Sequence, residues 1–220
     1  MSSLKEFVSN VENGLLSDIA PIEELKIDYI GNDYLYPFMA REKCTKRGMW
    51  AIVDKTWTKQ LAQWIGDRKC LEIMAGAGWL SKALNEHNID IIATDDDSWV
   101  NKENKHTNIK KVYPIETING KDAVNKYSDR DILIVSWPPY DNEEICRICD
   151  EWGSDRPIVY IGEGDGGCCA PEIFWTDFKI EDEPNIKIPR WQGIHDRLMV
   201  GYWQKMNANN SIGQLELSEY

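Results

Sequence analysis

The chain has 220 residues, of which 42% are hydrophobic, so it is long and apolar enough to form one globular domain with its own core. Its formal net charge of −12 argues against duplex DNA as a partner, because tight DNA binding relies on lysine and arginine side chains at the phosphates. The sequence shows neither a signal peptide nor an apolar run near the roughly 20 residues of a membrane span, so we expect a cytoplasmic protein without membrane contact.

Residues 1–65 are predicted to form a mainly helical N-terminal extension. Apolar residues recur at helical spacing near both ends of this stretch: Leu4, Val8, Val11 and Leu15, then Leu61, Trp64 and Ile65. The intervening residues 29–41 are rich in aromatic side chains. Two interpretations stay open for four of its and the neighbouring aromatic residues, which can pack in the core or form a lid over a ligand pocket: Tyr34, Tyr36, Phe38 and Trp50.

From residue 69 onward, short buried runs alternate with helical segments. The runs cover 69–74, 90–94, 110–115, 131–136 and 157–162, followed by about 178–188 and 197–204. Helical segments between the first five predict an α/β fold with a Rossmann-like, seven-stranded, mainly parallel, doubly wound sheet. No helix separates the last two, which predicts a C-terminal antiparallel hairpin at the sheet edge. We assign the core to residues 66–205 and a flexible tail to the polar residues 206–220.

The carboxyl ends of the parallel strands are the expected place for a ligand, as in other open α/β sheets. Five loops are predicted to meet there: Ala75–Trp79, Asp95–Trp99, Trp137–Asp141, Gly162–Cys169 and 189–196. These loops hold nearly all of the unusual residue chemistry of the chain. Their coincidence predicts an active site at this edge.

The six cysteines are expected to be free thiols, because nothing in the chain indicates an oxidising compartment. Cys146 and Cys149 have a spacing found in zinc sites, but they lie in a predicted helix over 143–152 with no nearby histidine. We therefore predict no metal site and interpret the pair as helix packing.

The stretch Cys70–Trp79 is the most informative motif, because a buried strand is followed by a Gly-x-Gly turn and a helical pattern. Gly76 and Gly78 carry no Cβ, so a ligand can lie against the backbone. The next strand ends in Asp95, and a carboxylate there can accept hydrogen bonds from both ribose hydroxyls. No Lys-Ser/Thr pair follows the glycines, which excludes a P-loop, and no third glycine stands at the dinucleotide spacing, which disfavours NAD.

These features resemble the class I S-adenosylmethionine-dependent methyltransferases over about residues 65–205. The resemblance implies S-adenosylmethionine as cofactor, with Glu72 as the acid of the first motif and Asp95 as the ribose-binding acid. Met74 stands where the family usually has its first glycine. Glu116 and Asp122 both stay open for the acid that meets the adenine amine. The cofactor residues implied are Glu72, Ala75, Gly76, Gly78, Asp95, Asp96, Glu116, Trp137 and Pro138.

Ser136-Trp137-Pro138-Pro139-Tyr140 resembles the [Asp/Asn/Ser]-Pro-Pro-[Tyr/Phe] motif of amino-methyltransferases that act on adenine, cytosine, guanine or glutamine. In that family the first side chain accepts a hydrogen bond from the target amine. Here Trp137 holds that position, and an indole donates but does not accept. Strand alternation predicts that Ser136 faces the other way. Together with Gly-Glu-Gly at 162–164 and the run 191–196, the motif is similar to a poorly characterised group of methyltransferase-like proteins.

Three residues are candidates for the substrate chemistry. Tyr140 can stack on a planar substrate, Glu163 can bind an amine or a cation, and His195 can act as a general base near neutral pH. A surface acid and a loop histidine bonded to the backbone remain alternative interpretations of the last two.

We predict a methyltransferase that transfers a methyl group to nitrogen or oxygen of a small-molecule or protein acceptor. One alternative is an RNA or DNA base amino-methyltransferase that uses the Trp-Pro-Pro-Tyr loop, so RNA stays open as a partner. The other is a catalytically inactive methyltransferase-like binding or regulatory protein, which Met74 and Trp137 motivate as departures from the motifs. The sequence fixes neither the acceptor nor the oligomeric state.

Overall fold

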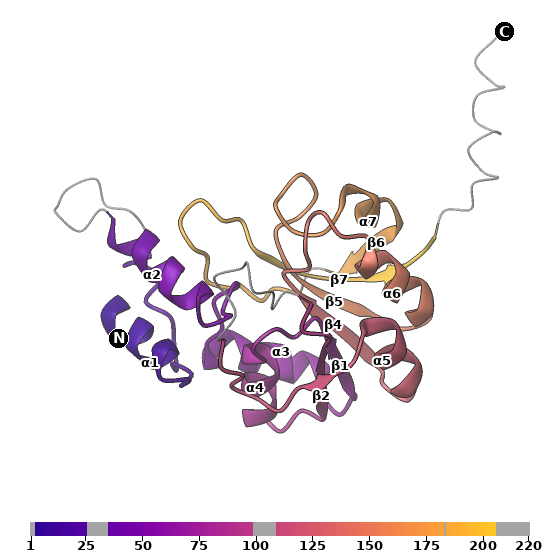
Figure 1. The fold of residues 1–220 in the computed structure, drawn as a ribbon, viewed down its shortest axis with the longest axis horizontal. Helices are drawn as coiled ribbons and strands as arrows, with labels where there is room; N and C mark the ends of the chain where they lie inside the picture. Colours follow the sequence, from indigo (N-terminus) through magenta and orange to yellow (C-terminus); the bar gives the residue numbers. More distant parts are fainter. Residues whose placement is uncertain (1–2, 26–34, 99–108, 183, 206–220) are drawn as a thin grey trace, which may run out of the picture.

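The computed structural model describes residues 3–25, 35–98, 109–182 and 184–205. Its strands are β1 (Cys70–Ile73), β2 (Ile91–Asp95), β3 (Glu116–Thr117), β4 (Ile132–Ser136), β5 (Ile158–Gly162), β6 (Phe178–Asp182) and β7 (Arg197–Trp203). They form one sheet in the order β3-β2-β1-β4-β5-β7-β6 (Figure 1). The first five pair in parallel, and β7 is antiparallel to both β5 and β6. This confirms the predicted Rossmann-like sheet with its C-terminal hairpin.

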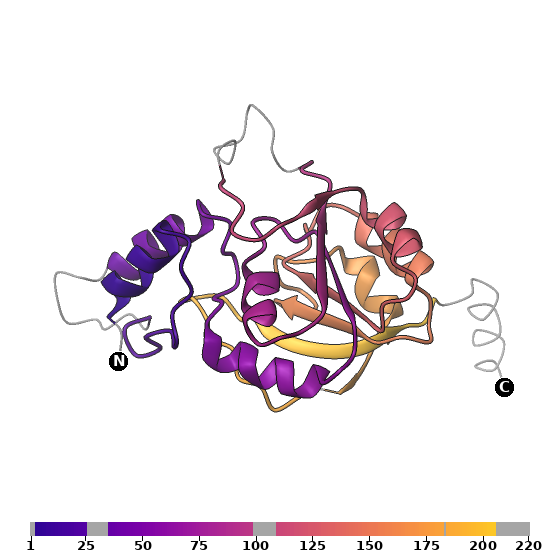
Figure 2. The same cartoon turned by 90° about the horizontal axis from the view of Figure 1, so that it is seen from below.

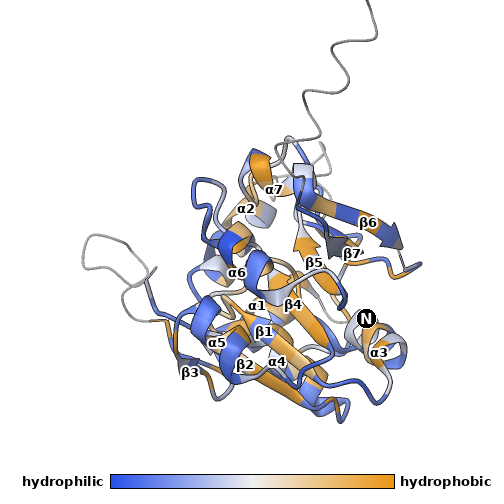
Figure 3. Cartoon of the chain, turned by 90° about the vertical axis from the view of Figure 1, so that its right-hand side faces the viewer, coloured by the Kyte–Doolittle hydropathy of each residue, from blue (hydrophilic) through white to orange (hydrophobic). Residues whose placement is uncertain are grey.

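The helices are α1 (Leu4–Glu12), α2 (Tyr36–Thr45), α3 (Lys55–Ile65), α4 (Trp79–Glu86), α5 (Gly120–Lys126), α6 (Glu144–Trp152) and α7 (Glu172–Asp177). Helices α1, α3 and α4 contribute to one apolar cluster, and α5, α6 and α7 contribute to a second. Strand β4 feeds both, because Ile132 and Ile134 point to the first cluster and Leu133 and Val135 to the second. Figure 3 shows the central strands as mainly hydrophobic, as burial on both faces requires.

The described part of the N-terminal extension packs into the same core as the sheet. Leu4 and Val11 of α1 belong to the cluster that contains Ile134 and Val200. Helices α1 and α2 lie side by side at the end of the molecule away from α5 and α6 (Figure 2). Asp54 caps α3 by accepting hydrogen bonds from the backbone N–H groups of Thr56 and Trp57, and a third from Ala20. Tyr34, Trp99 and the predicted tail lie outside the described residues.

The predicted third strand at 110–115 is wrong, because β3 is only Glu116–Thr117. The backbone N–H of Val112 donates instead to the carbonyl of Ala77, at 2.9 Å, and Pro114 has no N–H to donate. Tyr113 and Ile115 lie over Gly78, where an added Cβ would come within 2.9 Å and 3.1 Å of them. The apolar run therefore covers the glycine turn. Residues 109–115 form no helix, and the predicted helix before them falls on 99–108, outside the described residues.

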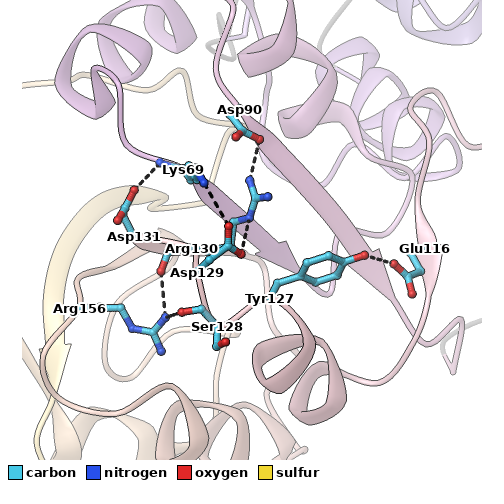
Figure 4. Close-up of polar contacts among 9 residues, drawn as sticks. All are labelled: Lys69, Asp90, Glu116, Tyr127, Ser128, Asp129, Arg130, Asp131 and Arg156. Carbon is cyan, nitrogen blue, oxygen red and sulfur yellow. Dashed lines mark hydrogen bonds and ion pairs between the residues drawn. The ribbon is translucent and has the colours of Figure 1, made fainter.

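Ion pairs and hydrogen bonds connect the amino ends of the parallel strands (Figure 4). Lys69 donates its backbone N–H to Asp131 Oδ2 at 2.7 Å, which joins the starts of β1 and β4. Arg130 Nη1 lies 2.6 Å from Asp90 Oδ1, just before β2. Arg156 Nη1, before β5, donates to two carbonyls of the turn that leads into β4. These contacts link the strands at the end of the sheet opposite the predicted site. Within the described residues, no helix is both long and apolar enough to span a membrane.

Candidate functional site

A cavity of about 370 Å³ lies at the carboxyl ends of the parallel strands. Its walls come from the loops after β1, β2 and β4, from Ile118 and Gly120 after β3, and from the start of α6. Trp50 and Cys168 complete it from two further loops. The volume lies in the range of cofactor and small-molecule sites. The cavity therefore stands where the topology of the sheet predicts a ligand.

The cavity brings together half of the residues that the sequence predicted for the site. The predicted residues that line it are Gly76, Asp95, Asp96, Trp137, Pro138 and Tyr140. Those that do not are Glu72, Ala75, Gly78, Glu116, Glu163 and His195. The hydrogen bonds and packing described below show how most of the residues outside the lining are engaged.

Asp95 holds the glycine turn against the end of β2. Its Oδ2 accepts a hydrogen bond from the backbone N–H of Gly76 at 2.7 Å, and its Oδ1 accepts one from Asp97 at 2.7 Å. Gly76 has φ 57°, and an added Cβ would meet no atom within 4 Å. The backbone of Gly76 is therefore open to a ligand in the cavity. Gly78 is instead a packing glycine, closed off by Tyr113 and Ile115.

Met74 adopts a conformation that usually requires glycine. Its φ is 51°, in the left-handed region that is costly for a residue with a Cβ. The residue lines the cavity, at the position where the sequence lacks the expected first glycine. The turn thus keeps the backbone that a glycine would give, with a methionine side chain added to the wall.

The acids Glu72, Glu116 and Asp122 do not line the cavity. Glu72 is buried and accepts a hydrogen bond from Ser81 Oγ on α4; burial raises its pKa to about 7 although this bond opposes the shift. Glu116 lies 2.6 Å from Lys126 Nζ and also accepts a hydrogen bond from the Tyr127 hydroxyl. Asp122 sits in the first turn of α5, where its backbone N–H donates to the capping Asn119 side chain. The structure puts Ile118 and Gly120 at the cavity in place of an acid from this region.

Trp137 has a left-handed backbone with φ 55°. Its indole Nε1 donates to Asp196 Oδ1 at 3.0 Å, and its ring stacks on Trp50 with centroids 5.7 Å apart. Ser136 and Trp137 both line the cavity, although strand alternation predicts opposite directions for their side chains. Strand alternation holds for extended backbone, and the left-handed turn at Trp137 ends it.

Glu163 and His195 join two loops behind the cavity wall. Glu163 is 7% exposed; its Oε2 accepts hydrogen bonds from Cys168 N at 3.0 Å and Sγ at 2.8 Å, and its Oε1 accepts one from His195 N at 2.8 Å. Burial alone would raise the pKa of Glu163, but these hydrogen bonds outweigh it and lower the pKa to about 2. The His195 side chain is 77% exposed, with Nδ1 3.4 Å from Glu163 Oε1. Of the three residues, Cys168 reaches the cavity.

The N-terminal segment 47–50 supplies a wall that sequence reasoning only partly foresaw. Trp79 Nε1 donates to the Arg47 carbonyl at 2.8 Å, and Trp191 Nε1 donates to the Trp50 carbonyl at 3.2 Å. A Cβ on Gly48 would come within 2.6 Å of the Ala77 Cβ, so this segment lies directly on the glycine turn. No local spacing rule links these positions. The same holds for Asp196, whose contact with Trp137 spans 59 residues.

The charge of the cavity is uniformly negative or neutral among its described lining residues. The carboxylates are those of Asp95, Asp96, Asp141 and Glu144, and no lysine, arginine or histidine lines the cavity there. A cleft lined by one sign of charge favours ligands of the opposite sign. The cavity therefore suits a ligand with positive charge and without phosphate groups.

The cysteines form no metal site in the described part of the chain. All six are free thiols. Cys146 and Cys149 lie on α6, and burial raises the pKa of Cys146 to about 11. No group of three or more histidine, cysteine, aspartate or glutamate side chains is placed to hold a metal ion among the residues described.

No protein-family model and no curated protein sequence matches the chain. Among solved structures, it is similar to a 1,6-didemethyltoxoflavin-N1-methyltransferase from Burkholderia thailandensis with bound S-adenosylhomocysteine (11% identity, 81% of this chain and 93% of that chain, TM-score 0.46). It is also similar to a magnesium protoporphyrin IX methyltransferase from Synechocystis with bound S-adenosylmethionine (10%, 83% and 89%, TM-score 0.44). A third is a protein of the NADB-Rossmann superfamily from Streptococcus agalactiae (14%, 69% and 69%, TM-score 0.40). The fold assignment rests on the strand order given above.

Proposed function

We propose that the protein is an S-adenosylmethionine-dependent methyltransferase. The observation that carries the proposal is an acidic cavity, built on a Gly-x-Gly turn, at the switch point of a sheet whose last strands form a reversed hairpin. S-adenosylmethionine is an adenosine derivative with a positive sulfonium and no phosphate. A nucleotide with phosphates would find no basic side chain among the described lining residues. The charge of the cavity therefore favours the first ligand over ATP or NAD.

The described residues suggest how this cofactor would be held. Asp95 and Asp96 are the acids at the end of β2 and would accept hydrogen bonds from the ribose hydroxyls. Ile118 and Ile148 would give the adenine an apolar surface, and the open backbone of Gly76 would let the cofactor lie close.

The chain's own part in the reaction is positioning and exclusion of water. When bound, the cofactor would supply an electrophilic methyl group: an acceptor nitrogen or oxygen attacks the methyl carbon in line as its bond to sulfur breaks, S-adenosylhomocysteine leaves, and the proton of the acceptor goes to solvent. We assign Trp137, Pro138 and Tyr140, which line the cavity, to the wall that would face the acceptor, and Tyr140 is 55% exposed. Glu163 holds the backbone N–H groups of His195 and of Cys168, and Cys168 lines the cavity as well. Orienting two reactants in this way lowers the barrier without a covalent contribution from the protein.

The acceptor that we propose is a small molecule or a protein side chain, methylated at nitrogen or oxygen. The test is transfer of labelled methyl from S-adenosylmethionine to separate small-molecule, protein and RNA fractions. Transfer to either of the first two is expected, and Tyr140→Ala should lower it about tenfold or more while S-adenosylhomocysteine affinity is kept. Ile173→Ala is the control, because Ile173 is similarly exposed (51%) but lies on α7 outside the cavity. Cofactor binding without transfer to any fraction would favour a binding or regulatory protein.

One observation favours a base amino-methyltransferase as the second candidate. Ser136 lines the cavity beside Trp137, and a serine hydroxyl can accept a hydrogen bond that an indole cannot. This alternative requires label in the RNA fraction and its loss in Ser136→Ala. Binding to the RNA should then weaken steeply with added salt.

A further inference from the structure

Trp137 is held in a conformation that its own backbone does not favour. A φ of 55° is unusual for a bulky residue and persists only where the surroundings over-determine it. The backbone N–H of Trp137 donates to the Ile161 carbonyl at 2.9 Å, which anchors the start of the turn. The backbone N–H of Ala170 donates to the Pro138 carbonyl at 3.0 Å and anchors the end of the turn, so the Trp137 side chain adds its contacts to a turn that the backbone holds on both sides.

The bond to Asp196 is the directional contact of the Trp137 side chain. Stacking on Trp50 tolerates sliding of one ring over the other, and the Arg41 guanidinium lies 5.9 Å from the Trp137 ring centroid. The hydrogen bond from Nε1 to Asp196 Oδ1, at 3.0 Å, fixes both the direction and the depth of the indole. Asp196 itself does not line the cavity.

Asp196 is a buried acid whose carboxyl group is only partly hydrogen-bonded. It is 0% exposed, and its Oδ2 has no hydrogen-bond partner among the described residues. Burial raises its pKa to about 7, while the bond from Trp137 opposes this shift. The titratable groups that act on it or respond to it come from four segments: Arg41 on α2, Tyr160 on β5, Glu163 and Cys169 in the loop after β5, and Arg190 before β7. Glu163 raises the pKa of Asp196, and Arg190 and Arg41 lower it.

We propose that Asp196 is a positioning residue whose ionised carboxylate fixes Trp137, and with it the Ser136–Pro138 wall, in the form that binds ligand. A hydrogen bond to a carboxylate is stronger than one to the neutral acid. Raising the pH through neutrality therefore tightens the wall, and lowering it loosens the wall. The proposal rests on the proposed function only for the ligand used in the binding assay.

The first test observes the indole directly. The full chain has ten tryptophans, so a sample labelled with ¹⁵N-tryptophan gives a small set of indole N–H signals, and Trp137→Phe assigns one of them. That signal should shift between pH 6 and 8. Asp196→Asn should abolish the titration while the amide oxygen keeps accepting the bond. Asp54→Asn is the control, because Asp54 is a buried acid that caps α3 outside the cavity, and it should leave the titration intact.

The second test measures S-adenosylhomocysteine affinity by calorimetry at pH 6 and pH 8. Wild-type affinity should be about fivefold weaker at pH 6, and Asp196→Asn should remove this dependence. Asp196→Ala should bind weakly at both values. A Trp137 signal that does not titrate, or affinity unchanged in Asp196→Ala, would overturn the proposal. Absence of all binding would instead contradict the proposed function, and the indole titration would still decide the role of Asp196.

Discussion

At residue 74 a methionine occupies the left-handed backbone region, with φ 51°. The side chain is half-buried against an apolar cluster and also faces the cavity, so packing retains a residue that the backbone disfavours. Met74→Gly and Met74→Ala both remove this side chain, but only glycine relieves the strain. Met74→Gly should be more stable than Met74→Ala by about 1 kcal/mol, the reverse of the usual order of these residues. Urea unfolding of the two variants measures the difference, and equal stability would argue against a strained turn.

Individual residues of the site differ in how far their positions could be predicted from the sequence. The place of Gly76 and Asp95 at the cavity was predictable, because it follows from a local turn and from the end of the next strand. The place of Ser136 at the cavity beside Trp137 was not, because alternation assumes an extended backbone, which ends at Trp137. Glu116 illustrates a third case, since local charges on α5 compete for an acid that the resemblance assigned to the cofactor.

At the scale of elements, α5 meets α6 through Gly120. A Cβ on this residue would overlap the Cδ1 of Ile148 and lie 2.8 Å from its Cγ1. Gly120→Ala should therefore destabilise the protein by roughly 1–3 kcal/mol, despite the better helix propensity of alanine. Ile148→Ala removes the overlapping atoms, so the double variant should lose less stability than the sum of the two single losses. Additive losses in denaturant unfolding would show that the two helices do not meet in this way.

The buried strands β1, β2, β4, β5 and β7 fall within one or two residues of their predicted runs, because central strands with apolar side chains on both faces leave a clear signal. The run 110–115 is equally apolar, yet Tyr113 and Ile115 cover Gly78. The hydrophobicity of this run predicts that its side chains are buried, but it does not predict which part of the chain they pack against. The third strand was therefore misplaced by the same rule that located the others.

At the scale of the whole molecule, the topology rule located the site and long-range contacts completed it. The loops after β1, β2 and β4 line the cavity because parallel strands end at one edge. Trp50 reaches the same cavity through a contact with Trp191 that spans 141 residues, and sequence spacing does not encode such a contact. The N-terminal helices share the core of the sheet, so the site depends on the folded chain as a unit.

The most direct test of the proposed cofactor site is a calorimetric titration with S-adenosylmethionine and S-adenosylhomocysteine, with ATP and NAD as controls. Two matched variants sharpen it. Gly76→Arg and Gly66→Arg place the same side chain on glycines with φ 57° and 62°, each with open space around an added Cβ, but only Gly76 lines the cavity. We predict micromolar binding of both sulfur ligands to the wild type and to Gly66→Arg, loss of binding in Gly76→Arg, and no binding of ATP or NAD. Unchanged affinity in Gly76→Arg, or a preference for ATP or NAD, would contradict the assignment.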